Sequence, residues 1–497
     1  MAHLPEAPKG SIHLVLLHSN DIHGDFFPKD REGTRTGGLS LLSGYIRRVR
    51  RECPNVLYAI GGDMFMGSLI DQEYRGLSSI RLTNVLEPDV FALGNHEVDY
   101  GLSHLLFLEK CADFPVICAN MYIRELNRRL FLPCVDIRRD GILVRFIGLL
   151  TPSVNERISQ EALIDRTVSV RDVRRELVTF FEKEQREPAD LTVLLTHIGI
   201  EEDRPLASFL KKEWGVDLIL GGHSHTFMDA PVIEAGIPIV QAGSGSGQIG
   251  RFDLYFDPDT RRLERYSWQL QSVTAETSEP DPLVDFYGEY YENAVNRKYD
   301  QVLFTLPQQY THPTYHNETQ IMDLITDIYQ DAFSCDLFMM TTNVLRTRQL
   351  GPTVTRKDFK IALPYDNAIY FLRMDGRRLE KMIRYMYRRE SWFGTAIFFL
   401  CSGQLHFTLT HARWEIESLT LGGMPIDPDR VYTVGTTGYA YKNLSAFLGI
   451  RDDELEKAVQ IRKVCDNDHD YLEDYFSAHR ELALKNEGRI HFLDKRI

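Results

Sequence analysis

The sequence predicts an α/β fold in which short buried strands alternate with helices. Between residues 12 and about 256, nine apolar, β-rich runs are separated by loops or by helical patterns, the clearest of which lie at 39–53 and 170–185. At least five of these runs end, on their C-terminal side, in Asp, Asn or His beside Gly or Thr. Ligands of open α/β sheets bind at the carboxyl ends of the strands, so we expect a functional site there.

The composition is that of a globular protein. The chain has 497 residues, 43% of them apolar and 26% charged, which suggests two or three domains with substantial cores. The net charge of −14 argues against a nucleic-acid binder, because such proteins carry a basic face for the phosphate backbone. A small anionic substrate remains compatible with this charge, because bound metal ions can reverse the local field.

Several features predict a cytoplasmic protein that does not enter a membrane. The first apolar run has no basic region before it and feeds directly into the motif below, so it reads as a strand rather than a signal peptide. No apolar stretch is long enough to span a bilayer. Seven scattered cysteines without CxxC pairs are typical of reduced thiols in the cytosol.

Composition and pattern also predict the division of the chain. We expect an N-terminal domain at residues 10–270, a polar linker and connecting helix at 271–300, and a C-terminal domain at 301–497. In the last of these, "HNETQIMDLITDIYQDAF" predicts an amphipathic helix, with Asn317 and Gln320 spaced as a capping pair.

Five strand-end clusters carry the chemistry. A single His at a strand end is usually an ordinary loop residue, but five such clusters in order make coincidence very improbable. The clusters are "NDIHGD", "GGDMF", "GNHEVDYG", "LLTHIG" and "GGHSHT", which supply Asp21, His23, Asp63, Asn95, His96, Asp99, His197, His223 and His225.

The kinds of ligand narrow the choice of metal. Carboxylate, imidazole and amide oxygen without thiolate suit Mn, Fe, Co, Ni or Zn. Six strong ligands are too many for one ion that must also hold water and substrate. They suit two divalent ions about 3.5–4 Å apart, bridged by one carboxylate.

The series DxH, GGD, GNHE, TH and GGHxH resembles the calcineurin-like metallophosphoesterase superfamily. "HSNDIHG" and "GNHEVDYG" resemble its bacterial-type 5′-nucleotidase and 2′,3′-cyclic phosphodiesterase family in particular. A weaker resemblance to that family's C-terminal domain covers residues 300–497, through "LPYDNA" and "GGMPIDPDRVYTVGTT". The resemblance implies a four-layer β-sandwich flanked by helices, followed by a smaller α/β substrate-binding domain.

The resemblance also implies a role for each cluster. Asp21, His23 and His225 would hold the first metal. Asn95, His197 and His223 would hold the second, and Asp63 would bridge both. His96 and Asp99 are expected to form a catalytic pair that stabilises charge on the phosphoryl group or the leaving oxygen. Ordinary roles outside the metal shell are expected for three neighbours, His18, Asp25 and Glu97.

Members of this branch grip nucleotides with arginines on the phosphate and two aromatic rings around the base. Arg346 is retained here in "TTNVLR", although the family's glycines are not. Tyr439 is expected to be one ring, in a place where "AYKNLS" replaces the family's loop. Phe398, or its neighbour Phe399, is expected to be the second ring.

These observations predict a dinuclear metallophosphoesterase that uses a metal-bridged hydroxide, with a nucleoside 5′-monophosphate as first choice of substrate. The alternatives are a 2′,3′-cyclic nucleotide phosphodiesterase, a nucleotide-sugar hydrolase and a cytosolic phosphatase for a non-nucleotide ester. A more remote one is a non-catalytic metal-binding protein. The expected partner is a small-molecule phosphoester, not nucleic acid or a membrane. The sequence leaves open the metal ions, the leaving group and the oligomeric state.

Overall fold

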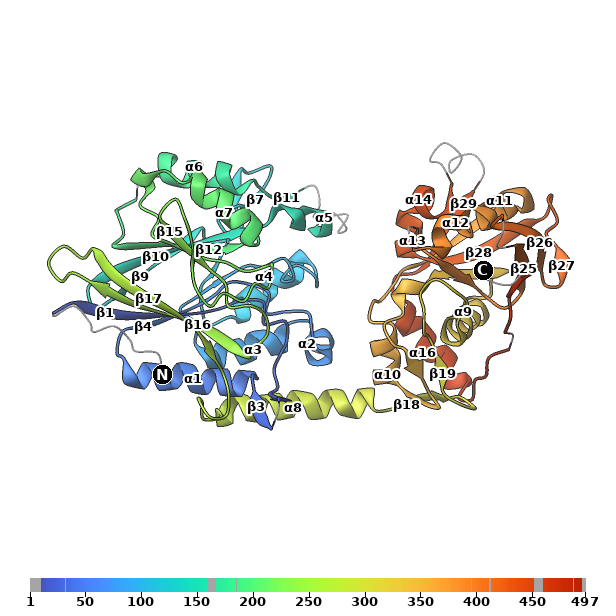
Figure 1. The fold of residues 1–497 in the computed structure, drawn as a ribbon, viewed down its shortest axis with the longest axis horizontal. Coiled ribbons are helices and arrows are strands. Elements are labelled where there is room, and N and C mark those ends of the chain that lie inside the picture. Colours follow the sequence, from blue (N-terminus) through green and yellow to red (C-terminus); the bar gives the residue numbers. More distant parts are fainter. Residues whose placement is uncertain are drawn as a thin grey trace. The chain divides into compact units, whose positions relative to one another are not determined.

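A computed structural model describes residues 10–31, 33–158, 167–184, 186–394, 396–410, 413–450, 459–485 and 487–493. The chain divides into two compact units, Met1–Val295 and Asn296–Ile497. Helix α8 (Pro282–Tyr299) runs across the division between them (Figure 1).

Two six-stranded sheets form the first unit. Each contains four neighbouring parallel strands, which antiparallel strands extend on one side in the first sheet and on both sides in the second. The first sheet has the order β17 (Leu263–Ser272), β16 (Gln248–Phe256), β1 (Ile12–Ser19), β4 (Val56–Ile60), β5 (Val90–Ala92) and β6 (Val116–Ile117). The second has the order β14 (Val232–Glu234), β15 (Ile237–Val240), β13 (Leu218–Leu220), β12 (Leu191–His197), β10 (Ile142–Leu150) and β9 (Cys134–Arg139).

The sheets pack face to face over a shared apolar core. Residues of both sheets, such as Leu57 and Leu195, belong to one fully buried cluster. The central strands are apolar on both faces because each sheet also carries helices outside. On the second sheet, Leu177 and Phe180 of α6 (Val173–Lys183) pack against Leu149 and Leu194. The predicted four-layer α/β architecture is therefore confirmed.

Helix α1 (Leu39–Glu52) and helix α6 lie in the two stretches where the sequence predicts helical patterns, 39–53 and 170–185. In α1 the buried positions include Leu39, Leu42, Ile46 and Val49, the spacing of a single helix face. The helices are α1 (Leu39–Glu52), α2 (Leu69–Tyr74), α3 (Leu77–Leu86), α4 (Leu102–Cys111), α5 (Asn155–Ile158), α6 (Val173–Lys183) and α7 (Ile200–Phe209). Two small sheets accompany them, β2 (Lys29–Arg31) with β3 (Thr34–Thr36), and β11 (Val168–Val170) with β7 (Met121–Ile123) and β8 (Arg128–Arg129).

The second unit has its own core and two larger sheets. Five strands have the order β24 (Phe399–Cys401), β20 (Leu337–Thr341), β28 (Val431–Thr437), β23 (Ile369–Asp375) and β29 (Gln460–Cys465). Four have the order β27 (Met424–Pro425), β26 (Glu415–Leu421), β25 (Leu405–Thr410) and β30 (Ile490–Phe492). Two strand pairs are β18 (Val302–Thr305) with β22 (Thr353–Thr355), and β19 (Tyr310–Thr311) with β21 (Gln349–Leu350).

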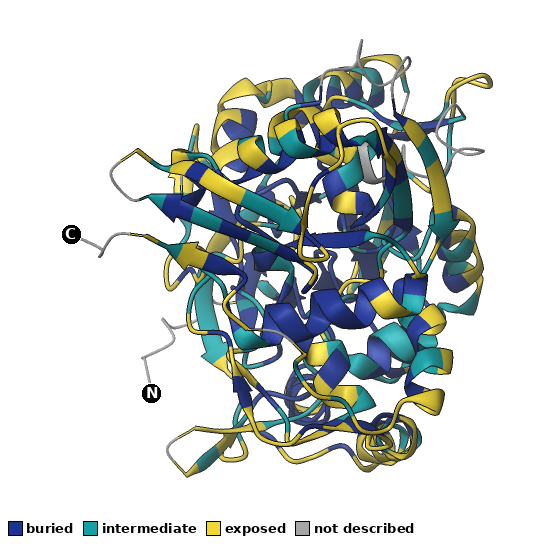
Figure 2. Ribbon diagram, turned by 90° about the vertical axis from the view of Figure 1, so that its right-hand side faces the viewer, coloured by how far each residue is buried: buried dark blue, intermediate teal, exposed yellow. Residues whose placement is uncertain are grey.

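The helices of the second unit lie around these sheets. In the described part of this unit they are α9 (Gln320–Phe333), α10 (Arg356–Ala362), α11 (Gly376–Met386), α12 (Arg389–Trp392), α13 (Gly438–Lys442), α14 (Leu444–Leu448) and α16 (Asp468–Ala478). Helix α9 is buried along most of its length. In Figure 2 the buried positions lie on inner strands and inward helix faces, and the exposed ones lie on outer faces and loops.

One expected detail is wrong, and two further features complete the fold. The N-cap of α9 is Thr319, whose hydroxyl hydrogen-bonds His312, so Asn317 does not cap this helix. All seven cysteines are free. Within the described part of the chain, no helix combines the length and the apolar character needed to cross a bilayer.

Candidate metal centre

The candidate ligands leave the carboxyl ends of parallel strands in both sheets. Asp21 and His23 follow β1, Asp63 follows β4, and Asn95 follows β5 in the first sheet. The second sheet supplies His197, the last residue of β12, and the pair His223 and His225 after β13. Because parallel strands end at one edge, these side chains converge although they come from distant parts of the sequence.

The backbone at this edge turns sharply. Asp21, His23, Asp63, His223 and His225 all have positive φ, between 50° and 80°. This left-handed region is unfavourable for residues with a Cβ, and such conformations cluster at functional sites. The turns are what direct successive side chains toward one point.

A first group joins Asp21, His23 and His225. Nε2 of His23 lies 3.1 Å from Nε2 of His225, and Nε2 of His225 lies 3.3 Å from Oδ1 of Asp21. Nδ1 of His23 faces the carbonyl oxygens of Phe65 and Met66 at 3.0 and 3.1 Å. Donation to these carbonyls leaves Nε2 as the nitrogen that can bind a cation.

A second group joins Asp63, His197 and His223. Nε2 of His197 lies 3.1 Å from Oδ2 of Asp63, and Nδ1 of His197 donates to the carbonyl of Gly61 at 2.7 Å. Oδ2 of Asp63 also lies 3.8 Å from Nε2 of His23, which places this carboxylate between the two groups. Asn95 is buried, and the amide of the next residue, His96, donates to Oδ1 of Asp63.

The donor set fits divalent cations. With Nδ1 of His23 and of His197 donating to carbonyls, each Nε2 faces carboxylates and can either carry a proton or bind a cation there. Although burial disfavours its charged form, the Asp63 carboxylate raises the pKa of His197 to about 10. The same negative charge would attract a metal ion in place of the proton.

Glu97 holds the loops under this group and does not face it. Its carboxylate accepts hydrogen bonds from the backbone amides of Asp63, Met64 and Gly94 at 2.9, 2.9 and 2.6 Å. Burial and the charge of Asp63 raise the pKa of Glu97 to about 7. These contacts agree with the structural role expected for it.

His96 and Asp99 form a close pair beside the ligands. Nδ1 of His96 lies 2.5 Å from Oδ2 of Asp99, and the His96 ring lies edge-on to that of His23 at 5.1 Å. A second pair, Tyr100 and Asp71, was not predicted from the sequence. The hydroxyl of Tyr100 donates to the buried carboxylate of Asp71 at 2.6 Å, which anchors the residue that follows Asp99.

The other two neighbours without an expected metal role, Asp25 and His18, also lie outside the groups of candidate ligands. Asp25 accepts hydrogen bonds from the amide and hydroxyl of Ser246 and pairs with Lys29 at 2.7 Å. His18 is fully buried within β1, and this burial lowers its pKa to about 3. Neither belongs to a described group of metal-capable side chains.

The residues expected to bind substrate lie in the second unit. Tyr439 is 43% exposed and Arg346 is exposed, with its guanidinium 5.8 Å from the Tyr365 ring centre. Phe398 is 1% exposed and packs edge-on to Tyr387 and Trp392. Its neighbour Phe399, the alternative for the second ring, is fully buried, so neither ring is exposed to a base in this structure.

The two facing sheets bring carboxylate, imidazole and amide side chains together at one edge, and a His–Asp pair lies beside them. This combination of fold and site is that of a metallophosphoesterase. The comparisons with known proteins agree. The calcineurin-like phosphoesterase model matches residues 14–227, and the 5′-nucleotidase C-terminal domain model matches residues 301–448. The chain belongs to the 5′-nucleotidase family of calcineurin-like phosphoesterases, which are metal-dependent hydrolases of phosphate esters.

Relatives and solved structures resemble the chain over nearly its full length. The 5′-nucleotidase of Mus musculus is 24% identical, over 98% of this chain and 92% of that protein. The 5′-nucleotidase of Vibrio vulnificus is 24% identical, over 86% and 84%. The 5′-nucleotidase precursor from Thermus thermophilus shares the fold with a TM-score of 0.64 at 23% identity, over 98% of this chain and 100% of that one. A putative 5′-nucleotidase from Staphylococcus aureus does so with a TM-score of 0.68 at 18% identity, over 97% and 100%.

Proposed function

We propose that this chain is a 5′-nucleotidase, which hydrolyses a nucleoside 5′-monophosphate to the nucleoside and inorganic phosphate. The observation that carries the proposal is the convergence of ligand groups from two sheets on Asp63, next to the His96–Asp99 pair. The match of residues 301–448 to the 5′-nucleotidase C-terminal domain supports a nucleotide as the substrate.

The proposal includes two divalent ions. Asp21, His23 and His225 would hold one ion, and His197, His223 and Asn95 would hold the other. Asp63 lies between the groups and would contact both. When bound, such ions acidify water and neutralise charge on the phosphoryl group. Asp21 and His197 are fully buried, so these ligands are held in place before the substrate arrives.

His96 would act on the substrate. The 2.5 Å contact with Asp99 fixes the ring and places the proton of Nδ1 on the carboxylate side. Nε2 is then the atom that can donate to the phosphoryl group or to the departing ribose oxygen. Asp99 stabilises the imidazolium form that such a donation requires, as a carboxylate beside a catalytic imidazole does in general.

The second unit would hold the nucleoside. Arg346 is exposed and can pair with phosphate, and the exposed ring of Tyr439 offers a stacking face. Phe398 and Phe399 are both buried, which leaves the second stacking position without an exposed ring from either of the residues expected there. This observation favours one other candidate, a metal-dependent phosphatase for a non-nucleotide ester.

A substrate panel separates these functions. The metal-free protein is reconstituted with Mn²⁺, its metal content is measured, and phosphate release is followed for several esters in parallel. The panel contains nucleoside 5′-monophosphates, 2′,3′-cyclic nucleotides, a nucleotide sugar, sugar phosphates and an aryl phosphate. Preference for a 5′-monophosphate supports the proposal. Preference for a sugar phosphate, with slow hydrolysis of every nucleotide, would replace it with the phosphatase.

A further inference from the structure

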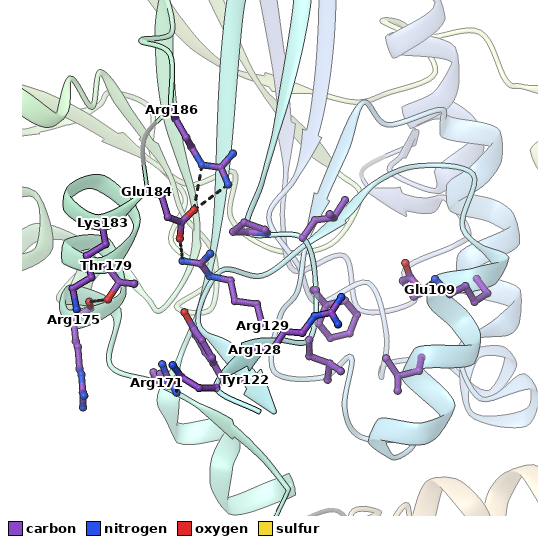
Figure 3. A pocket seen from close by; sticks show the side chains of 17 residues that line it. Glu109, Tyr122, Arg128, Arg129, Arg171, Arg175, Thr179, Lys183, Glu184 and Arg186 are labelled. Carbon is purple, nitrogen blue, oxygen red and sulfur yellow. Dashed lines mark hydrogen bonds and ion pairs between the residues drawn. The ribbon is translucent and has the colours of Figure 1, made fainter. Parts of the chain in front are cut away.

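A basic pocket lies in the first unit, and none of its lining residues belongs to the candidate metal centre. Its volume is about 1020 Å³, and its lining contains seven Lys and Arg side chains but only two carboxylates. The whole chain has a net charge of −14, so this excess of positive charge is a local exception. Figure 3 shows Arg175 and Lys183 on one side, Glu109 on the other, and Arg128 and Arg129 between them.

Some of these cations already have partners. Arg129 pairs with the buried Glu176 and with Glu184. Glu184 also forms an ion pair with Arg186. Three others differ. Among the described residues, no carboxylate lies within ion-pair distance of Arg128, Arg175 or Lys183, and all three are exposed. Their charges are therefore available to an anionic ligand.

The pocket offers no platform for nucleic-acid bases. Its tyrosine, Tyr122, is 4% exposed, and the guanidinium of Arg171 already covers the ring at 3.5 Å from its centre. Its phenylalanine, Phe131, is also buried. Proteins that bind single strands stack bases on exposed aromatic rings, so a single-stranded nucleic acid is a poor fit.

The pocket does offer an aliphatic wall. Leu106 and Leu132, which are 37% and 59% exposed, line it together with the cations. A matching ligand has carboxylates beside an apolar side chain. Arg175 and Lys183 lie eight residues apart on α6, about 12 Å at the helical rise, a distance that about four residues of extended peptide span.

We infer that this pocket docks an acidic segment of a partner protein. The carboxylates of the segment pair with Arg128, Arg175 and Lys183, and an aliphatic side chain packs on Leu106 and Leu132. Arginine forks recognise carboxylates by two parallel hydrogen bonds, and the concave wall excludes part of the water that would otherwise screen them. This inference goes beyond the proposed hydrolysis and does not depend on it.

The test uses the full-length protein and a fluorescein-labelled decapeptide of alternating Glu and Leu, with binding followed by fluorescence anisotropy. The variant Arg128→Glu/Arg175→Glu should weaken binding by about tenfold or more. The variant Arg262→Glu/Lys212→Glu is the matched control, because it reverses two exposed cations outside the pocket and should change affinity less than about twofold. Unchanged hydrolysis of an aryl phosphate by both variants shows that they fold.

A second comparison tests the aliphatic wall. Leu132→Ser should lower the affinity for the Glu–Leu peptide by about threefold or more and leave the affinity for a polyglutamate peptide nearly unchanged. The inference is overturned if the native protein does not bind the Glu–Leu peptide, or if charge reversal in the pocket and in the control has equal effects. Binding of a thymidine oligonucleotide that is lost on Arg128→Glu/Arg175→Glu, without peptide binding, would also overturn it in favour of nucleic acid.

Discussion

Nδ1 of His96 lies 2.5 Å from Oδ2 of Asp99, three residues further along the same loop. This contact fixes the ring of His96. We propose that this imidazole, which lies beside the candidate ligands, acts on the substrate and not on a metal. Its role can therefore be separated experimentally from metal binding.

His96→Ala should retain bound metal and lose about 10²–10⁴-fold in kcat, because its proposed work is on the transition state. Asp99→Asn should lose less, about 10- to 100-fold, because the ring remains. Steady-state kinetics on a nucleoside monophosphate and on a nitrophenyl phosphate provide the readout. The loss should be larger for the nucleoside monophosphate than for nitrophenyl phosphate, because the ribose oxygen is the more basic leaving group and depends more on protonation. A control is Asp259→Asn, at an exposed position. Unchanged kcat in His96→Ala would remove His96 from the mechanism.

Asp63→Asn should lose nearly all turnover and much of its metal, because this carboxylate approaches both His23 and His197. Its shape is nearly that of the native residue, so the fold should persist. Metal analysis after dialysis, run beside the phosphate-release assay, measures both losses. A fully active variant that still binds two ions would contradict the dinuclear assignment.

Tyr439→Ala should raise KM for a nucleoside monophosphate by about 10- to 100-fold, since stacking contributes about 1–3 kcal/mol. Hydrolysis of a small aryl phosphate, which has no base to stack, should hardly change. Tyr471 has the same 43% exposure in the same unit, so Tyr471→Ala is the matched control. Equal loss on both substrates would indicate damage to the fold, and no loss on either would mean that recognition of the base lies elsewhere.

Stability should fall on acidification because of His312. Burial, together with the nearby charge of Arg348, lowers the pKa of this histidine to about 4. The unfolded chain then binds a proton below pH ~6.5 that the folded chain binds only near pH 4, so stability is lost as pH falls through that interval.

Urea unfolding between pH 7 and pH 4 measures this effect. The free energy of unfolding should fall more steeply for the native chain than for His312→Asn, by an amount on the order of 2–3 kcal/mol. His491, which is exposed, provides the control His491→Asn, which should behave as the native chain does. Parallel curves for native and His312→Asn proteins would show that His312 does not titrate in this way.

The sequence alone was sufficient to predict the layers and the clustering at the sheet edge. Each ligand follows a run of apolar β-formers, and parallel strands end at one edge whatever the rest of the chain does. The positive φ of Asp21 or His223 could not be predicted, because neither Asp nor His requires that conformation.

The orientation of side chains in the second unit was harder to predict from the sequence. "AIFFLCSG" is apolar throughout, so no alternation shows which ring faces the core, and Phe398 proved to be buried. The basic pocket could not be predicted from the sequence, for another reason. Its cations are spread from Lys110 to Arg186, and only the packing of α4, α6 and the small sheet of β7, β8 and β11 brings them together.

His23 and His225 lie 202 positions apart in the chain, and each belongs to a loop of a different sheet. A cation held by both would act as a reversible cross-link that closes a very long loop, as a disulfide does through covalent bonds. Closing such a loop restricts the unfolded chain more than a local clip would. Removal of the cation by a chelator would then weaken the attachment of one sheet to the other. The metal centre would therefore stabilise the fold of the domain in addition to its part in hydrolysis.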